Sequence, residues 1–187
     1  KIALGSGVIT PRAGREKSGL SGAGFSGDGG PAAAARLSSP AGLALDTGGT
    51  LLFVDLGNNR IRHVALPGGI ITTAVGRAIT AELQYPTEIA VDSDGNLFIA
   101  DSSNNRIRRV SIATGHIATV AGSGSPGWGK GSFSGDGGPA TNATLNLPSG
   151  LAFDGQGALF IADTANNRIR RLELKSGIIT TVAGTGA

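Results

Sequence analysis

Two identical stretches of the chain hold an aspartate among three glycines. FSGDGGPA occurs at residues 25–32 and again at residues 133–140. Bare backbone amides around Asp28 and Asp136 suggest a loop that grips a cation or a phosphate. Calcium, however, takes six or more oxygen ligands, and each loop supplies one carboxylate. We therefore expect first a chain reversal in which the aspartates bond nearby amides and the proline starts a short helical turn. Ligand binding stays as the alternative.

Two phosphate-binding signatures also occur near these loops. Residues 22–27 and 122–127 carry the glycine spacing of dinucleotide-binding folds, and residues 124–130 resemble a phosphate loop that ends at Lys130. The first signature needs a helix within a strand–helix–strand unit, and the second needs Ser or Thr where this chain has Gly131. No helical periodicity follows either stretch. We expect no cofactor, and we keep Lys130 as a candidate ligand contact.

An Asp-x-x-Asn-Asn-Arg group occurs three times. Three such groups around a ring could form a basic rim for an acidic ligand or RNA phosphates. Asp and Asn are also suited to closing a turn, and Arg can bind carbonyl groups or the neighbouring carboxylate. A set present in every copy is better suited to building each unit, so we interpret the groups as structural and a nucleic-acid partner as disfavoured. Their members are Asp55, Asn58 and Arg60; Asp101, Asn104 and Arg106; and Asp163, Asn166 and Arg168.

Function is expected where the copies differ. Glu88 stands where the sister copies have Gly42 and Gly150, and Tyr85 precedes it. Glu88 could face a central channel, although a single carboxylate rarely makes a site. Trp128, the only tryptophan, could contact a ligand or pin its own loop.

The two histidines are not placed to bind a metal. His63 and His116 fall in different copies and on different predicted strands, without the spacing of metal ligands. The chain also lacks cysteine, which excludes disulfides and thiolate metal sites. We expect no metal site.

A repeat positions all these candidates. Three copies of a 37-residue frame align without a gap, and residues 1–14 match the end of a fourth. The copies span residues 40–76, 86–122 and 148–184. The link before the second copy is 16 residues shorter than the others (46 against 62 residues between the repeated glycines) and lacks FSGDGGPA.

Each copy has the pattern of four short strands. In the first copy, runs rich in β-branched residues are separated by Asp-x-x-Gly, Gly-Asn-Asn and Pro-Gly-Gly turns. These runs cover residues 43–46, 51–55, 60–66 and 70–75. Four strands in each repeat of roughly 40–50 residues predict an all-β propeller of four-stranded antiparallel blades.

The frame resembles the NHL-repeat β-propeller family. In the third copy it reads PSGLAFD at residues 148–154, IAD at 161–163, NNRIR at 166–170 and GIITTVAG at 177–184. The GDGGPA insertion is similar to that of the bacterial, surface-associated branch. The resemblance implies six blades to a ring, and it covers relatives that bind RNA and six-bladed lactonases and lyases with ligands in the central channel.

We expect a single propeller segment. Residues 1–14 would end a preceding blade, and residues 15–76, 77–122 and 123–187 would form three repeats. Three blades are too few to close a ring, so we expect part of a six-bladed or longer array, or else homo-oligomers that form through open blade edges.

Composition agrees with a turn-rich globular chain. Glycine makes up 32 of the 187 residues, 40% of the residues are hydrophobic, and the net charge is +3. No apolar stretch approaches the roughly 20 residues of a membrane span, and no signal leader is evident. We therefore hypothesise a non-enzymatic scaffold, extracellular or in the cell envelope, for protein or carbohydrate binding or surface structure. Recognition is expected through the face that bears both the long blade-to-blade loops with FSGDGGPA and the Asp-x-x-Asn-Asn-Arg hairpins. A channel-site hydrolase or lyase, an RNA-binding domain and a self-assembling subunit remain the alternatives.

Overall fold

The computed structural model describes residues 13–14, 24–66, 68–76, 83–111, 113–124, 127 and 130–186. They form three antiparallel sheets, each with four strands in sequential order, which confirms the predicted blades. Blade 1 comprises β1 (Pro40–Leu45), β2 (Leu51–Asp55), β3 (Arg60–Ala65) and β4 (Ile70–Val75). Blade 2 comprises β5 (Pro86–Val91), β6 (Leu97–Asp101), β7 (Arg106–Val110) and β8 (Ile117–Ala121). Blade 3 comprises β9 (Pro148–Phe153), β10 (Ala158–Asp163), β11 (Arg168–Glu173) and β12 (Ile178–Ala183).

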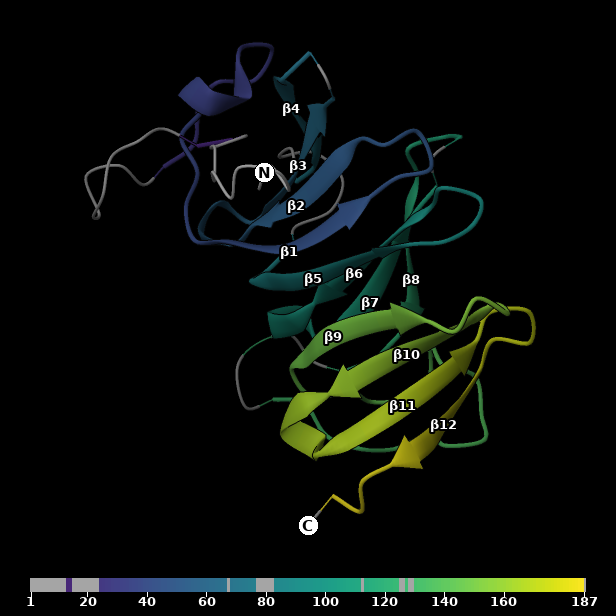
Figure 1. Ribbon diagram of the computed structural model, residues 1–187. Helices are drawn as coiled ribbons and strands as arrows, with labels where there is room; N and C mark the ends of the chain where they lie inside the picture. Colours follow the sequence, from purple (N-terminus) through teal and green to yellow (C-terminus); the bar gives the residue numbers. More distant parts are fainter. Residues whose placement is uncertain are drawn as a thin grey trace, which may run out of the picture.

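The blades follow one another as in a propeller. The first strands β1, β5 and β9 lie next to each other, and the fourth strands lie away from this line (Figure 1). Each second strand turns into the third through a short 3-10 segment: η3 (Leu56–Asn58), η4 (Ser102–Asn104) and η5 (Thr164–Asn166). We call the edge of the molecule that carries these three turns and the starts of β1, β5 and β9 the hairpin face.

Turn chemistry explains where the strands stop. The carboxylate of Asp46 accepts the backbone N–H of Thr50 at 2.7 Å and closes the first hairpin of blade 1. After η3, Asn59 adopts φ +51°, a left-handed conformation that Asn tolerates better than most residues. Gly76 then follows β4 with φ +103°, and a Cβ there would lie 2.6 Å from the carbonyl oxygen of Asn59. The last glycine of the frame is therefore required by close packing against the hairpin.

The core lies between the blades. One cluster joins blades 1 and 2 around Val54, Ile61 and Ile99, and a larger one joins blades 2 and 3 around Phe98 and Leu159. Burial of such side chains contributes on the order of 1.5–3 kcal/mol each. Adjacent blades therefore stabilise each other through these contacts, and a blade that lacks a neighbour exposes apolar surface to water.

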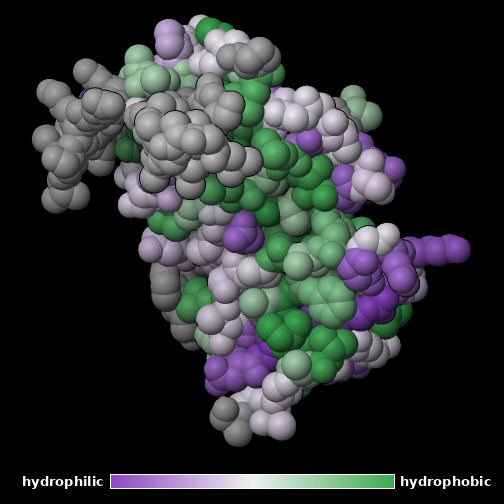
Figure 2. Space-filling view, viewed as in Figure 1, coloured by the Kyte–Doolittle hydropathy of each residue, from purple (hydrophilic) through white to green (hydrophobic). Residues whose placement is uncertain are grey.

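Such open surface occurs on blade 1. Phe53, Val64 and Ile71 form a third cluster with Ala32 and Ala35, while Leu43 and Leu45 of β1 are 71% and 61% exposed. Apolar residues run down the middle of the molecule in Figure 2. This face of blade 1 corresponds to the face with which blade 3 packs against blade 2.

Residues 1–12 of the predicted preceding blade lie outside the described residues. The N–H of Gly14 donates to the carbonyl of Ala32 at 2.9 Å, as that of Gly122 does to Ala140 between blades 2 and 3. The chain therefore enters blade 1 in the way it enters blade 3. No helix in the described part of the chain is long and apolar enough to cross a bilayer.

Candidate functional site

The aspartate of each hairpin group is a buried hub. Asp55, Asp101 and Asp163 are fully buried at the ends of β2, β6 and β10. One oxygen of each accepts a backbone N–H from the preceding link at 2.7–2.8 Å, and the other accepts the amide of the Asn three residues later at 2.8–2.9 Å. These bonds tie the hairpin to the link that leads into its own blade.

The arginine of each motif has a different partner from that aspartate. Arg60 and Arg168 donate to the carbonyls of Asn58 and Asn166 at 2.8 and 3.0 Å, one of the two roles expected for them. No such bond is found for Arg106 among the described residues.

The arginine two residues further along the third strand binds the aspartate instead. Arg62 reaches Asp55 at 3.1 Å and Arg170 reaches Asp163 at 3.2 Å. Sequence reasoning missed this residue, although Arg-Ile-Arg places both arginines on one side of a strand.

The octapeptide FSGDGGPA provides a second carboxylate for the same arginine. Oδ1 of Asp28 lies 2.9 Å from Nη2 of Arg62, and Oδ1 of Asp136 lies 2.7 Å from Nη2 of Arg170. Both arginine side chains are 0% exposed. The aspartates were expected to bond nearby amides; their partner is a guanidinium group 34 residues away.

The phenylalanine of the octapeptide stacks on the arginine of the motif. The guanidinium carbon of Arg60 lies 4.0 Å from the ring centroid of Phe25, and that of Arg168 lies 3.7 Å from Phe133. Both rings remain partly exposed. A cation over an aromatic face contributes about 0.5–1 kcal/mol at an exposed site, so the ring adds to the ion pair.

The backbone of the octapeptide pairs with the outer strand of its own blade. Gly29 donates to the carbonyl of Ile71 at 2.8 Å, and Ile71 donates to the carbonyl of Gly30 at 3.0 Å. Gly137, Ile179 and Gly138 repeat this pattern at 2.8 and 3.1 Å. In blade 1 the chain then forms the expected helical turn, η2 (Ala32–Ala34), directly after Pro31. The insertion therefore covers the edge of β4 and of β12.

Blade 2 has the same hairpin without an octapeptide. Arg108 is 15% exposed and has one carboxylate nearby, Asp101 at 3.7 Å. Burial raises the pKa of Asp101 and of Asp163, and the hydrogen bonds to their neighbouring asparagines oppose this. Asp101 of blade 2 is therefore fully buried like Asp163 of blade 3, whereas Arg108 lies farther from its aspartate than Arg170 does.

The residues that differ between the copies lie elsewhere. Glu88 is half-buried on β5, and its Oε1 accepts the N–H of Ile89 at 3.0 Å. It lies against Gly42 of β1, where an added Cβ would come 2.9 Å from the Cα of Glu88. The substitution of glycine by Glu88 thus sits where two first strands make contact.

Tyr85 and Lys130 are exposed on the hairpin face. Tyr85 is 43% exposed, and its N–H donates to the side chain of Asn59 in the hairpin of blade 1 at 2.8 Å. Lys130 is exposed and donates its N–H to Gly127, which in turn donates to Ser103 in the hairpin of blade 2. Trp128 lies outside the described residues. The structure thus places these two candidates beside neighbouring hairpins and does not bring them together with Glu88.

The histidines lie on separate blades. Nδ1 of His63 lies 3.0 Å from the hydroxyl of Thr72, and His116 is exposed in the turn before β8. Within the described ranges, no group of three or more His, Cys, Asp or Glu side chains is arranged to hold a metal ion.

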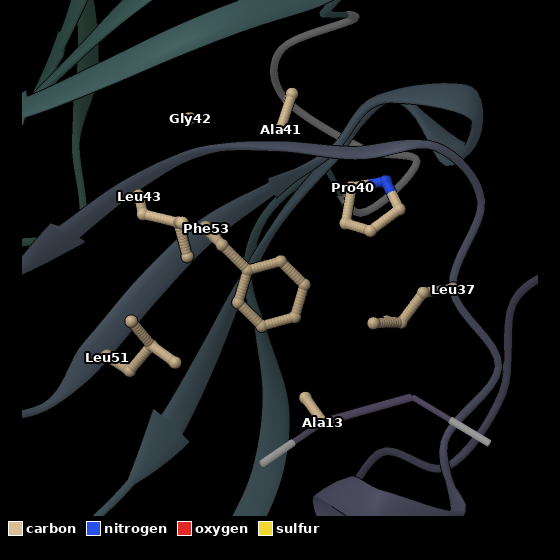
Figure 3. A pocket seen from close by; sticks show the side chains of 8 residues that line it. All are labelled: Ala13, Leu37, Pro40, Ala41, Gly42, Leu43, Leu51 and Phe53. Atoms are coloured by element: carbon tan, nitrogen blue, oxygen red, sulfur yellow. The ribbon is translucent and has the colours of Figure 1, made fainter. Parts of the chain in front are cut away.

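A pocket of about 290 Å³ opens on the uncovered side of blade 1 (Figure 3). Leu37, Leu51 and Phe53 point into it, with Ala13 opposite Pro40. The lining is apolar, and in blade 3 the residues equivalent to Leu37, Leu51 and Phe53 are packed against blade 2. The pocket thus corresponds to a blade interface, and no neighbouring blade fills it among the described residues.

Comparison with known proteins agrees with this architecture. The teneurin NHL domain model matches residues 124–187, and the NHL repeat model matches residues 83–110. A search of curated protein sequences found no match.

Solved structures share the fold over most of the chain. Virginiamycin B lyase from Staphylococcus aureus is 25% identical with a TM-score of 0.54, covering 77% of this chain and 41% of the lyase. The nidogen/laminin complex is 21% identical with a TM-score of 0.60, covering 79% and 49%. A gluconolactonase from Xanthomonas campestris is 17% identical with a TM-score of 0.60, covering 79% and 48%.

The chain therefore spans less than half the length of these structures. The repeated frame, the three four-stranded blades and both family models lead to the same assignment. Both family-model matches support an NHL-repeat β-propeller.

Proposed function

We propose that this chain is a non-enzymatic scaffold that binds a partner protein through the hairpin face. The observation that carries the proposal is a division of roles among the polar side chains. The repeated Asp and Asn groups are bonded within their own blades, whereas the variable Tyr85 and Lys130 are exposed beside the hairpins. A surface that varies over a fixed framework is typical of binding loops.

The side-chain types favour a protein partner. Tyrosine provides a large, rigid contact area with a polar end, and aromatic residues are enriched at protein interfaces. Lys130 adds a positive charge on the same face, which would steer an acidic surface toward it. The similarity to the nidogen/laminin complex supports a protein partner, and carbohydrate binding is the alternative that the experiment must separate.

Site-specific photocrosslinking tests the proposal. A photoreactive residue at position 85 is compared with one at position 94, which lies beyond the opposite end of β5. In extracts of the source cells, we expect a protein adduct from position 85 and none from position 94. Tyr85→Ala combined with Lys130→Ala should weaken binding of the identified partner about tenfold or more, as loss of an interface hot spot does. Equal adducts from both positions, or binding of glycans alone, would contradict the proposal.

We also propose that the protein is extracellular or lies in the cell envelope, in keeping with the expected role of the scaffold as a surface protein. Immunogold labelling of intact source cells would test it, with permeabilised cells as the control. Labelling that appears only after permeabilisation would count against this location.

A further inference from the structure

In the described part of the chain, no segment covers the outer edge of blade 2 as the octapeptide covers that of the other two blades. In blades 1 and 3 the octapeptide pairs with the fourth strand through Ile71 and Ile179. The strand β8 of blade 2 keeps the same register. Ile117 lies opposite Val110, as Ile71 lies opposite Val64 and Ile179 opposite Leu172.

This register fixes the direction of the backbone groups. Because the pairing is the same, the N–H and C=O of Ile117 point away from the third strand, as those of Ile71 and Ile179 do. Within the described residues, no backbone hydrogen bond reaches Ile117 from outside blade 2. The side chain of Ile117 is half-buried, whereas Ile71 and Ile179 are 0% exposed. Among the described residues, nothing occupies the outer edge of β8 at Ile117, where an added backbone could pair.

The positive charge beside this edge is also less well matched. Arg62 and Arg170 each lie between two carboxylates, one from the hairpin and one from the octapeptide. Among the described residues, Arg108 has one carboxylate within reach, that of Asp101 at 3.7 Å. Arg106, the counterpart of Arg60 and Arg168, has no phenylalanine over it in the described part of the chain.

We propose that the outer edge of blade 2 binds a glycine-rich peptide with a central aspartate from a partner protein, in the place that the octapeptide takes in blades 1 and 3. An aspartate would pair with Arg108, and an aromatic residue three positions earlier would stack on Arg106. The two glycines after the aspartate would exchange backbone hydrogen bonds with Ile117, as Gly29 and Gly30 do with Ile71. This proposal is tested through Arg108 and the previous one through Tyr85 and Lys130, so the two can fail independently.

The backbone conformation of the octapeptide also restricts which residues can flank its aspartate. Gly27 and Gly29 adopt φ +95° and +81°, and a Cβ on Gly27 would come 2.8 Å from the Cα of Ala35. Gly135 and Gly137 repeat these conformations at +86° and +77°. A peptide that fits blade 2 in the same way therefore needs glycine on both sides of its aspartate.

Binding in trans selects blade 2 over its neighbours. In blades 1 and 3 a covalently linked octapeptide competes at an effective concentration in the millimolar range, so an added peptide does not displace it easily. A short glycine-rich peptide also loses conformational entropy on binding. We expect a dissociation constant of about 0.1–1 mM for the octapeptide alone.

The probe is a fluorescently labelled, end-capped FSGDGGPA peptide, titrated into the 187-residue chain and followed by anisotropy. We expect saturable binding that falls about tenfold or more with Arg108→Gln, because the charge-assisted pair is lost. The matched peptide FSGNGGPA should lose a similar factor, and it leaves the protein unchanged. Arg109→Gln is the control variant, since Arg109 is exposed on the opposite side of β7.

Three outcomes would overturn the proposal. One is the absence of saturable binding at millimolar peptide. The second is equal binding of FSGDGGPA and FSGNGGPA, which would leave no role for the aspartate. The third is an equal loss of affinity with Arg109→Gln and Arg108→Gln while thermal unfolding shows both variants to be folded, because the site would then not be centred on Arg108.

Discussion

Blades 2 and 3 have the same hairpin but different surroundings for the arginine beneath it. In blade 3, Arg170 is fully buried between Asp163 and Asp136. In blade 2, Arg108 is 15% exposed and pairs with Asp101 at a longer distance. The difference arises from the octapeptide, which comes from the link and not from the four-stranded frame. A blade can therefore form without the insertion, and the insertion completes the charge pairing of the blade that follows it in sequence.

Removing the arginine should have the largest effect and should differ between the two blades. Arg170→Met leaves two carboxylates without their partner, one of them fully buried, and we expect a loss of about 3–5 kcal/mol in the free energy of unfolding. Arg108→Met removes a weaker contact and should cost less than half of that. Urea unfolding of both variants measures the difference, and equal losses would show that the octapeptide does not strengthen the pair.

Removing the aspartate of the octapeptide should have a smaller effect. Asp136→Asn keeps Arg170 paired with Asp163, and the Asp136 side chain is 37% exposed. After allowance for solvent screening, we expect a loss of about 1 kcal/mol in the free energy of unfolding. Asp94→Asn, at an exposed turn of blade 2, is the matched control and should change stability by less than about 0.5 kcal/mol. If both variants lose the same free energy of unfolding, the Asp136–Arg170 ion pair contributes no more than an exposed carboxylate outside the pair.

The pH dependence should be the smallest effect and should be shared by blades 2 and 3. Burial raises the pKa of Asp101 and Asp163 above the ordinary 3.8, so the unfolded chain releases these protons first as the pH rises. Their contribution to stability therefore falls as the pH increases from 3.8 through the raised values. Asp154 behaves in the opposite way, because backbone hydrogen bonds from Ala158 and Gln156 lower its pKa, and its contribution is lost as the pH falls below 3.8.

Carboxyl-carbon NMR titration can follow the three aspartates separately. We expect Asp101 and Asp163 to titrate above 3.8 and Asp154 below it. A raised value for Asp101 together with a lowered value for Asp163 would show that the better-placed arginine of blade 3 outweighs burial. Blades 2 and 3 would then differ in the pKa of the hairpin aspartate as well as in the position of the arginine.

The strands could be predicted closely because their signals are local. Three of the four predicted strands of the first copy match β2, β3 and β4 to within a residue, and β1 begins earlier, at Pro40. The asparagines Asn58, Asn104 and Asn166 also lie in the turns where they were expected, and each donates to the aspartate three residues earlier. Periodicity and turn chemistry act over a few residues, so one sequence is sufficient to read them.

The position of the octapeptide along β4 and β12 could not be predicted from such local signals. Asp28 meets Arg62 only because the octapeptide folds back along β4, and 34 residues separate the two. Arg-Ile-Arg occurs in all three copies, so the sequence of the third strand does not reveal which arginines acquire a second carboxylate. The octapeptide was expected to decorate the hairpin face; its backbone bonds instead lie along the outer edge of its own blade.

The second asparagine of the hairpin in blades 1 and 2 couples its blade to the next. The side-chain oxygen of Asn59 accepts the N–H of Tyr85, and that of Asn105 accepts the N–H of Leu147, both at 2.8 Å. Tyr85 and Leu147 hold the same position, one residue before the first strand of the following blade, and both adopt a positive φ. This contact is thus the same whatever side chain the residue that donates its N–H carries. A gene that encodes such a unit can gain or lose whole blades, because each new junction between blades contains the same asparagine contact.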